Sequence, residues 1–143
     1  MVGFEHRNFD RARPGYSGLT WETSAQWQPR ADTTLTAGAS RAAVEAPGEE
    51  VDEAIIRRFT LGATQDWSAR WHGTVTASAS HDRYVDSPVP RDDDVRAIDL
   101  SLRADVSRAW EVTLNFGWSH RSSVLTPFDF TRRVSSIVLT AAL

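Results

Sequence analysis

The sequence contains no cysteine, no lysine and no long apolar run. Without cysteine there is no disulfide, no thiolate nucleophile and no thiolate-bound metal. A membrane-spanning helix needs about 18 apolar residues in succession, whereas the runs here extend over only a few residues, as at 141–143. These absences exclude a helical membrane bundle, so a membrane-spanning structure would have to be built from strands.

The charge balance gives no support for binding to nucleic acid. The 143 residues include 16 basic and 19 acidic side chains, for a net charge of −3, whereas a nucleic-acid-binding surface is strongly basic. All 16 basic residues are arginines, whose planar guanidinium suits bidentate contacts with carboxylate and phosphate groups. We therefore predict no nucleic-acid partner.

The sequence repeats itself. Segments 32–41, 72–81 and 111–120 share one order of polar and apolar residues, and they begin 40 and 39 residues apart. Within the repeat, polar and apolar residues alternate with period two, which indicates strands and not helices. One repeat unit is therefore predicted to contain two strands, a short turn and a longer loop.

Seven whole strands and the stub of an eighth are predicted. The stub, residues 3–7, matches the end of a later strand at 117–121. The first residues also lack the basic start and apolar core of a signal peptide. We therefore expect residues 1–143 to be a single barrel segment that begins within a truncated strand and lacks its true N-terminus. The whole strands span approximately 19–28, 33–42, 55–64, 71–80, 97–106, 110–121 and 133–143.

The connections between these strands alternate between short and long. Membrane barrels have short turns at the periplasmic side and longer loops outside, and Greek-key sandwiches rarely keep such an alternation. The order therefore favours an all-β, antiparallel up-and-down transmembrane β-barrel, part of a larger barrel. Short turns are predicted at 29–32, 65–69 and 107–109, and long loops at 44–54, 82–95 and 122–132.

Two sets of side chains are candidates for functional surfaces. Four tryptophans lie beside the short turns, where a membrane interface would place an aromatic girdle. On the opposite parity the strands carry Thr, Ser, Asn and charged residues, which suit a wet lumen. The predicted girdle is Trp27, Trp67, Trp71 and Trp110, and the predicted lumen-facing charges are Glu22, Arg58, Asp99, Arg103, Asp105 and Glu111.

The same alternation leaves two other functions open. A small soluble lipocalin-like β-barrel would turn its apolar face inward and bind an apolar ligand. A barrel that only anchors or presents its long loops for adhesion would have no conducting lumen. The membrane and soluble alternatives differ in which face of the sheet meets water.

The residues give little support for catalysis or metal binding. Ser80–His81 and Ser119–His120 are adjacent pairs, and adjacent side chains on a strand point to opposite faces, so neither pair can join a nucleophile to its base. The acidic run at 92–94 lacks the spacing of a calcium loop. We predict no enzyme activity, no metal and no cofactor. Three arginines lie near the loop ends of strands, and two roles stay open for them: contact with lipopolysaccharide phosphates, or simple solvation. They are Arg57, Arg96 and Arg121.

The order of several short motifs resembles a known family. The chain is similar to the C-terminal part of the beta-barrel porin 2 family of proteobacterial outer-membrane proteins, whose members are considerably longer. The resemblance covers nearly the whole chain. Its motifs are Ser17–Trp21, Trp27–Pro29, Thr33–Leu35, Arg91–Asp94, the turn Ser107–Trp110, His120–Ser123 and Phe128–Val134.

The resemblance implies a place and partners for the protein. It implies the bacterial outer membrane, a porin-like or exopolysaccharide-export-associated passive channel, and contact with outer-membrane lipid, the barrel-assembly machinery, and polysaccharide or small polar solutes. The sequence departs from the usual pattern at its end, where Leu143 stands in place of the terminal aromatic residue that the assembly machinery reads.

Overall fold

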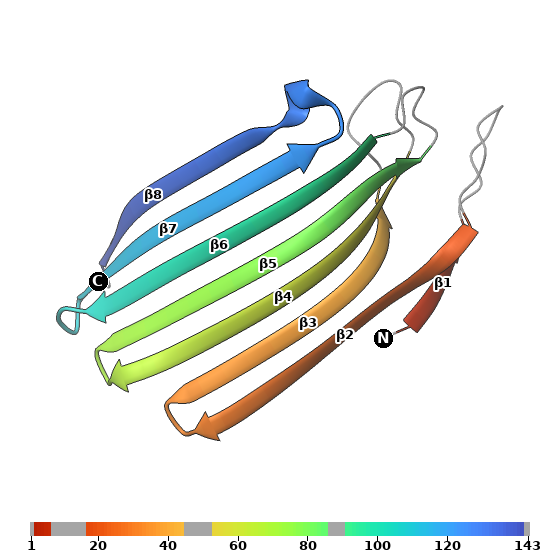
Figure 1. Ribbon diagram of the computed structural model, residues 1–143. Coiled ribbons are helices and arrows are strands. Elements are labelled where there is room, and N and C mark those ends of the chain that lie inside the picture. Colours follow the sequence, from red (N-terminus) through yellow and green to blue (C-terminus); the bar gives the residue numbers. More distant parts are fainter. Residues whose placement is uncertain (1, 7–16, 45–52, 86–90, 142–143) are drawn as a thin grey trace.

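The computed structural model of the chain describes residues 2–6, 17–44, 53–85 and 91–141. They form one eight-stranded sheet in which every strand pairs antiparallel with its neighbour in the sequence (Figure 1). The strands are β1 (Val2–His6), β2 (Ser17–Arg30), β3 (Thr33–Val44), β4 (Glu53–Ser68), β5 (Trp71–Val85), β6 (Arg91–Asp105), β7 (Trp110–Ser123) and β8 (Phe130–Ala141), and a single 3₁₀ turn, η1 (Thr126–Phe128), precedes β8.

The predicted up-and-down topology is confirmed. One five-residue strand and seven strands of 12 to 16 residues follow each other in the order of the sequence. Within the described residues the sheet is open, with β1 and β8 at its two edges (Figure 1). No helix in this part of the chain is long and apolar enough to cross a membrane.

The strands are longer than predicted at their loop ends. Residues 82–85 belong to β5 and residues 91–95 to β6, so the predicted loop at 82–95 was too long. Arg83 and Asp92 are cross-strand partners there, and both faces of the hairpin are polar. Backbone hydrogen bonds pair strands even where neither face is apolar. Because such a segment has no alternating hydropathy, its pairing cannot be detected from the sequence pattern. The predicted loop at 44–54 lies largely outside the described residues, as does Leu143.

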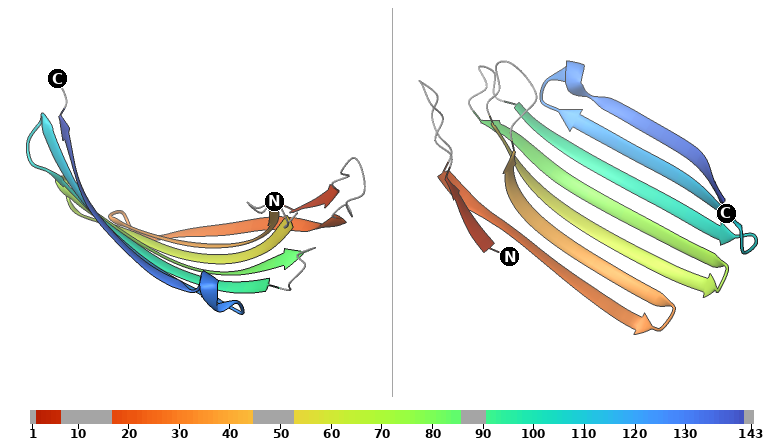
Figure 2. Two further views of the ribbon diagram at one scale, coloured as in Figure 1. Left: turned by 90° about the horizontal axis from the view of Figure 1, so that it is seen from above. Right: turned by 180° about the vertical axis from the view of Figure 1, so that it is seen from behind.

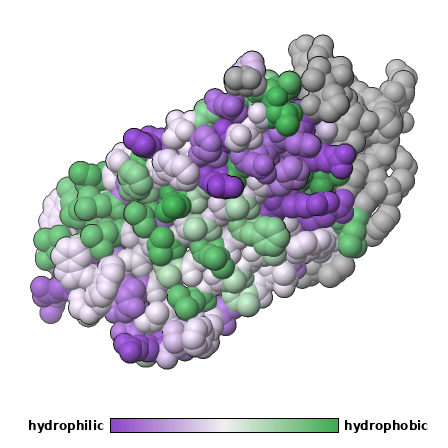
Figure 3. All heavy atoms as spheres, in the orientation of Figure 1, coloured by the Kyte–Doolittle hydropathy of each residue, from purple (hydrophilic) through white to green (hydrophobic). Residues whose placement is uncertain are grey.

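The sheet is strongly curved and its two faces differ in character. The face turned toward the viewer in Figure 1 is the convex one, as the view from above shows (Figure 2). Hydrophobic side chains spread over the middle of this convex face, and hydrophilic side chains gather at its loop end (Figure 3). The concave face carries the polar residues of the alternating pattern.

Burial in this sheet is inverted relative to hydropathy. On β5, Thr76 and Ser78 are partly buried, whereas Val75, Ala77 and Ala79 between and beside them are exposed. Leu61 and Ile137 are 64% and 75% exposed. Large apolar side chains in a water-soluble fold are mostly inside. In the middle of the sheet the polar face is therefore the more shielded one and the apolar face is exposed, whereas β8 at the edge is exposed on both faces.

Candidate functional surfaces: a polar concave face and a bounded apolar face

The structure places all six predicted lumen-facing charges on the concave face. Glu22 and Arg58 share one row, with Ser40 between them. Asp99 lies in the middle of β6, opposite Gly117. The other three lie at the short-turn end, where Arg103, Asp105 and Glu111 come together. The pairing register therefore places all six side chains on the same face of the sheet.

The cluster at the short-turn end also contains two residues that the sequence did not indicate. His72 Nδ1 lies 2.6 Å from a carboxylate oxygen of Asp66, and its Nε2 lies 3.7 Å from Asp105. Arg103 Nε lies 3.8 Å from Asp105 and 3.7 Å from Glu111. Three carboxylates thus surround one arginine and one histidine. His72 and Asp66 meet only through the β4–β5 register, which period-two alternation does not reveal.

A second cluster lies at the loop end of the concave face. Asp93 is fully buried and receives hydrogen bonds from Arg91, with Nε at 3.0 Å and 3.1 Å and Nη2 at 2.6 Å. The Arg91 guanidinium lies 3.6 Å from the ring centroid of Phe128 and 4.4 Å from that of Tyr84. Because Phe128 belongs to η1, this arginine ties the β7–β8 connection to β5 and β6.

Arg121 completes this second cluster. Its Nη1 lies 3.6 Å from Asp93 and its guanidinium lies 5.3 Å from the ring centroid of Phe130. Of the roles left open for Arg121, contact with lipid phosphates does not fit the structure, because its parity on β7 places it on the concave face. Asp82, the cross-strand neighbour of Asp93, is also buried, and its Oδ1 has no hydrogen-bond partner among the described residues.

The Asp93 carboxyl lies beyond the apolar band, near the strand ends. Burial alone would raise the pKa of Asp93, but hydrogen bonds from Arg91 and Ser123 and the charges of Arg91 and Arg121 outweigh burial. The net effect holds the pKa of Asp93 below its usual range. The carboxylate is therefore ionised wherever an ordinary aspartate is.

Two lines of residues bound the apolar convex face. Toward the loop end, a basic or histidine side chain follows the apolar band on each strand from β3 to β8, and we call this row the polar boundary. On β3 and β4 the apolar residues Ala43 and Ile55 lie beyond it. Toward the short turns the face ends at the four predicted girdle tryptophans, which we call the tryptophan boundary. The polar boundary consists of Arg41, Arg57, His81, Arg96, His120 and Arg133, and the tryptophan boundary of Trp27, Trp67, Trp71 and Trp110.

Both boundaries cross the sheet obliquely and in the same direction. The register carries Trp27 across to Phe116 on β7, six residues from Trp110. It carries Arg133 back to Ala37 on β3, four residues from Arg41. The two boundaries are thus offset along the strands by six and four residues, or about 20 and 14 Å. Over five strand spacings of about 4.8 Å each, these offsets correspond to a strand tilt of about 30–40°.

The distance between the boundaries matches a hydrocarbon layer. On β5 it runs from Trp71 to His81, ten residues, or about 33 Å along the strand. At the tilt derived above, this length spans about 26 Å in height, and the apolar band of a membrane barrel is about 25 Å tall. The tilt and the height come from the register and the side-chain pattern, and both are those of a membrane barrel.

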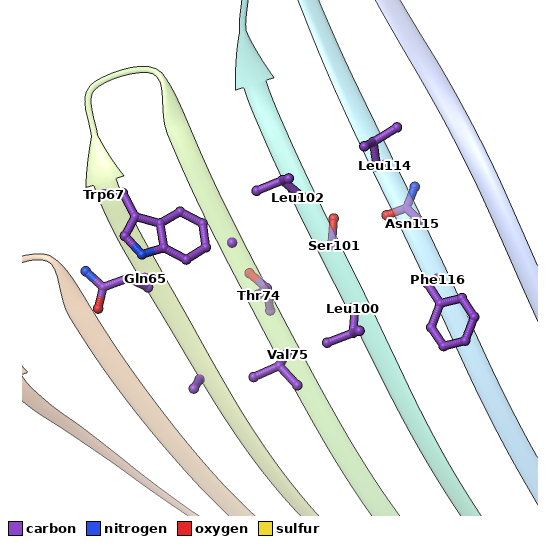
Figure 4. A pocket seen from close by; sticks show the side chains of 12 residues that line it. Gln65, Trp67, Thr74, Val75, Leu100, Ser101, Leu102, Leu114, Asn115 and Phe116 are labelled. Carbon is purple, nitrogen blue, oxygen red and sulfur yellow. The ribbon is translucent and has the colours of Figure 1, made fainter.

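A tryptophan of this boundary packs on a glycine. The Trp67 ring lies over β5 at one end of an open apolar depression of about 470 Å³ (Figure 4). A Cβ on Gly73 would lie 2.3 Å from Trp67 Cη2 and 2.6 Å from its Cζ3. Glycine at this position therefore lets the ring lie flat against the strand.

We expect Gly73→Ala to displace the Trp67 ring and to reduce stability by about 1 kcal/mol, the cost of an unfavourable rotamer. The matched control is Gly38→Ala, because a Cβ there meets nothing nearer than 3.8 Å. Near-ultraviolet circular dichroism reports the ring and urea unfolding reports the stability. Equal spectra and equal midpoints for the two variants would contradict the packing role of Gly73.

Two histidines occupy equivalent positions of the sequence repeat, at the ends of segments 72–81 and 111–120. His81 and His120 both lie on the polar boundary of the convex face. His81 Nδ1 lies 2.9 Å from Asp94 Oδ1, and His120 Nδ1 lies 2.9 Å from Thr131 Oγ1. Ser80, the neighbour of His81 in the sequence, points to the concave face and so lies on the other side of the sheet.

These features define the class of protein. A curved antiparallel sheet with a polar concave face, and with an exposed apolar convex face bounded at both ends, is the wall of a membrane-embedded β-barrel. The family model described as "Putative beta-barrel porin 2" matches residues 1–143, and the chain belongs to this family. A search of curated proteins and a search of solved structures each found no match.

Proposed function

We propose that the chain forms part of the wall of a water-filled, passive channel in the bacterial outer membrane. The concave face would line the lumen and the convex face would contact lipid. The observation that carries this proposal is the inverted burial pattern, in which the apolar side chains are the exposed ones. The soluble lipocalin-like alternative requires the opposite arrangement, with the apolar side chains inside.

The composition of the concave face indicates the kind of solute. Its central part carries small hydroxyl and amide groups, among them Thr76, Ser101 and Asn115, which suit small polar solutes or the hydroxyls of a polysaccharide. Among the residues whose side chains are described, seven carboxylates and five arginines lie on this face, so we expect it to favour cations over anions. They are Glu22, Asp66, Asp82, Asp93, Asp99, Asp105 and Glu111, and Arg58, Arg91, Arg103, Arg121 and Arg132.

The membrane-embedded state must also pair the two edges of the sheet. Unpaired backbone N–H and C=O groups at β1 and β8 would each cost several kcal/mol in hydrocarbon. In lipid, these edges would pair with each other or with further strands. An anchor or adhesion scaffold would share this requirement, and only a conducting lumen separates the channel from it.

The experiment that tests the channel compares the chain in plain buffer with the chain refolded into detergent micelles. We expect a β-rich species, with heat-modifiable gel migration, only in detergent. Inserted into a planar bilayer with a potassium chloride gradient, it should conduct and show a reversal potential of the sign for cation preference. A cooperative β-fold in plain buffer would support the soluble barrel instead, and insertion without conductance would support the anchor.

A further inference from the structure

The polar boundary contains a group of side chains that a channel does not need. We propose that Arg57 and Arg96 bind the phosphate-bearing headgroup of a lipid in the membrane leaflet at the loop end. The lipid's acyl chains would lie in an apolar valley on β5. This inference rests on the proposed membrane-embedded barrel and assigns a specific lipid site to its outer surface.

The register places the two arginines diagonally across β5, on its two neighbouring strands. Arg57 on β4 is paired with His81 on β5, and Arg96 on β6 is paired with Ala79, two residues further along. The two arginines are separated by two strand spacings across the sheet and by two residues along the strands, so their Cα atoms are about 12 Å apart. Both side chains line an open depression of about 370 Å³ that also includes Phe59.

The two guanidinium groups are available. Arg57 and Arg96 are exposed, and within the part of the chain that the structure describes neither forms an ion pair or a hydrogen bond. Asp94, the carboxylate in the same depression, contacts His81 instead: His81 Nδ1 lies 2.9 Å from Asp94 Oδ1. Arg133, another member of the polar boundary, lies in the same row as Ala77 and three strands away from it.

The convex face is positively charged at its loop end, whereas its apolar band is not. Among the residues whose side chains the structure describes, five arginines and two aspartates lie on the convex face beyond that band, whereas the concave face has an excess of carboxylates. An anionic ligand on the convex side therefore meets charge of the opposite sign, and guanidinium groups suit phosphate oxygens. The five arginines are Arg41, Arg57, Arg83, Arg96 and Arg133, and the aspartates are Asp92 and Asp94.

From the arginines into the hydrocarbon band, the register places small residues of β5 between larger apolar residues of β4 and β6, and we call this strip the apolar valley. Its floor is Ala79 and Ala77 on β5, and its walls are Phe59 and Leu61 on β4 and Ile98 on β6. Phe59 is 62% exposed and Ile98 is 41% exposed. Small residues between large ones leave space for an acyl chain directly below the guanidinium groups. A headgroup site joined to an apolar valley fits a lipid, since a free anion would gain nothing from the valley.

The test uses the whole chain refolded into phosphatidylcholine vesicles that contain a trace of spin-labelled lipid. Electron paramagnetic resonance gives the relative association constant of labelled phosphatidic acid, a phosphate monoester, against labelled phosphatidylcholine. The double variant R57Q/R96Q removes the site. The double variant R70Q/R108Q removes the same charge from two exposed arginines at the short turns and is the matched control.

We expect wild type to prefer phosphatidic acid and R57Q/R96Q to lose about 10- to 30-fold of that preference, since each basic residue near an anionic headgroup contributes about fivefold. The control should stay within about twofold of wild type. Excess inorganic phosphate should act no more strongly than chloride at equal ionic strength.

Three results would overturn the proposal while leaving the barrel intact. An unchanged preference in R57Q/R96Q would mean that these arginines are only solvated. An equal loss in both double variants would indicate general electrostatic attraction. Displacement by inorganic phosphate would indicate a free-anion site. Failure of the wild-type chain to fold in vesicles would instead overturn the proposed barrel, and the lipid site with it.

Discussion

Leu100→Arg should destabilise the folded protein in lipid by about 2–4 kcal/mol, the cost of an arginine at the bilayer midplane on the lipid face of a barrel. Leu100 lies on the convex face, in one row with Val75 and Phe116, midway between the polar and tryptophan boundaries. A guanidinium there has neither water nor a carboxylate within the apolar band. Urea unfolding from vesicles measures the loss as a shift of the midpoint at constant slope.

The matched control is Ser101→Arg, one residue further along the same strand. Ser101 lies on the concave face between Thr74 and Asn115, where a new arginine would meet water. We expect its unfolding midpoint to change little and its conductance to shift toward anions. A larger destabilisation for S101R than for L100R would show that the two faces are assigned the wrong way round.

The second large effect should come from Asp93→Ala. Removing this carboxylate leaves the guanidinium groups of Arg91 and Arg121 unpaired at a buried site. Breaking a buried pair typically costs about 3–5 kcal/mol. The Arg121 side chain retains 28% of its exposure, so we expect about 2–4 kcal/mol here. The control is Asp92→Ala, the exposed neighbour on the other face of β6, which should change stability by less than about 1 kcal/mol.

Chymotrypsin cleavage at Phe128 gives a local measure of the same change. Phe128 packs on Arg91, which Asp93 holds in place, so D93A should release η1 and increase the cleavage rate. Equal cleavage of D93A and D92A would contradict the role of the ion pair in holding this connection.

The stabilisation by Asp93 should also depend on pH. Because the pKa of Asp93 is lowered in the folded state, its contribution is fully present above the ordinary aspartate pKa. It is lost as pH falls through the depressed folded value. We therefore expect the difference in unfolding midpoint between wild type and D93A to be constant near neutral pH and to shrink only in strong acid. A difference that shrinks already near pH 6 would implicate a histidine instead.

Alternating hydropathy was sufficient to predict the strands and their order. Residues such as Leu35, Val75 and Leu100 alternate with hydroxyl residues because one face of the sheet is apolar throughout the band. Beyond the band this constraint ends. Residues 82–85 and 91–95 pair in the structure without any hydropathy signal, and the sequence therefore predicted a loop there.

The candidate site was predictable as a set of faces but not as a set of contacts. Parity placed Glu22, Asp99 and Arg103 on one face correctly, because parity is a local property of a strand. Contacts depend on register between strands, so the meeting of His72 with Asp66 was not predicted. Arg91 and Asp93 offered one usable signal, opposite charges two residues apart on the same face of a strand.

The distribution of arginines also has a kinetic consequence. If the short turns remain on the side from which the chain enters, the loop end of every strand must cross the hydrocarbon during insertion. Each arginine on the convex face then adds to the barrier at the moment it passes the midplane, although it costs little once it has arrived. The rate of insertion, and not the final stability, is then the quantity limited by Arg41, Arg57 and Arg96. A thin or locally disordered bilayer, such as an assembly machinery can provide, would lower that barrier most, and R57Q/R96Q would insert faster than wild type.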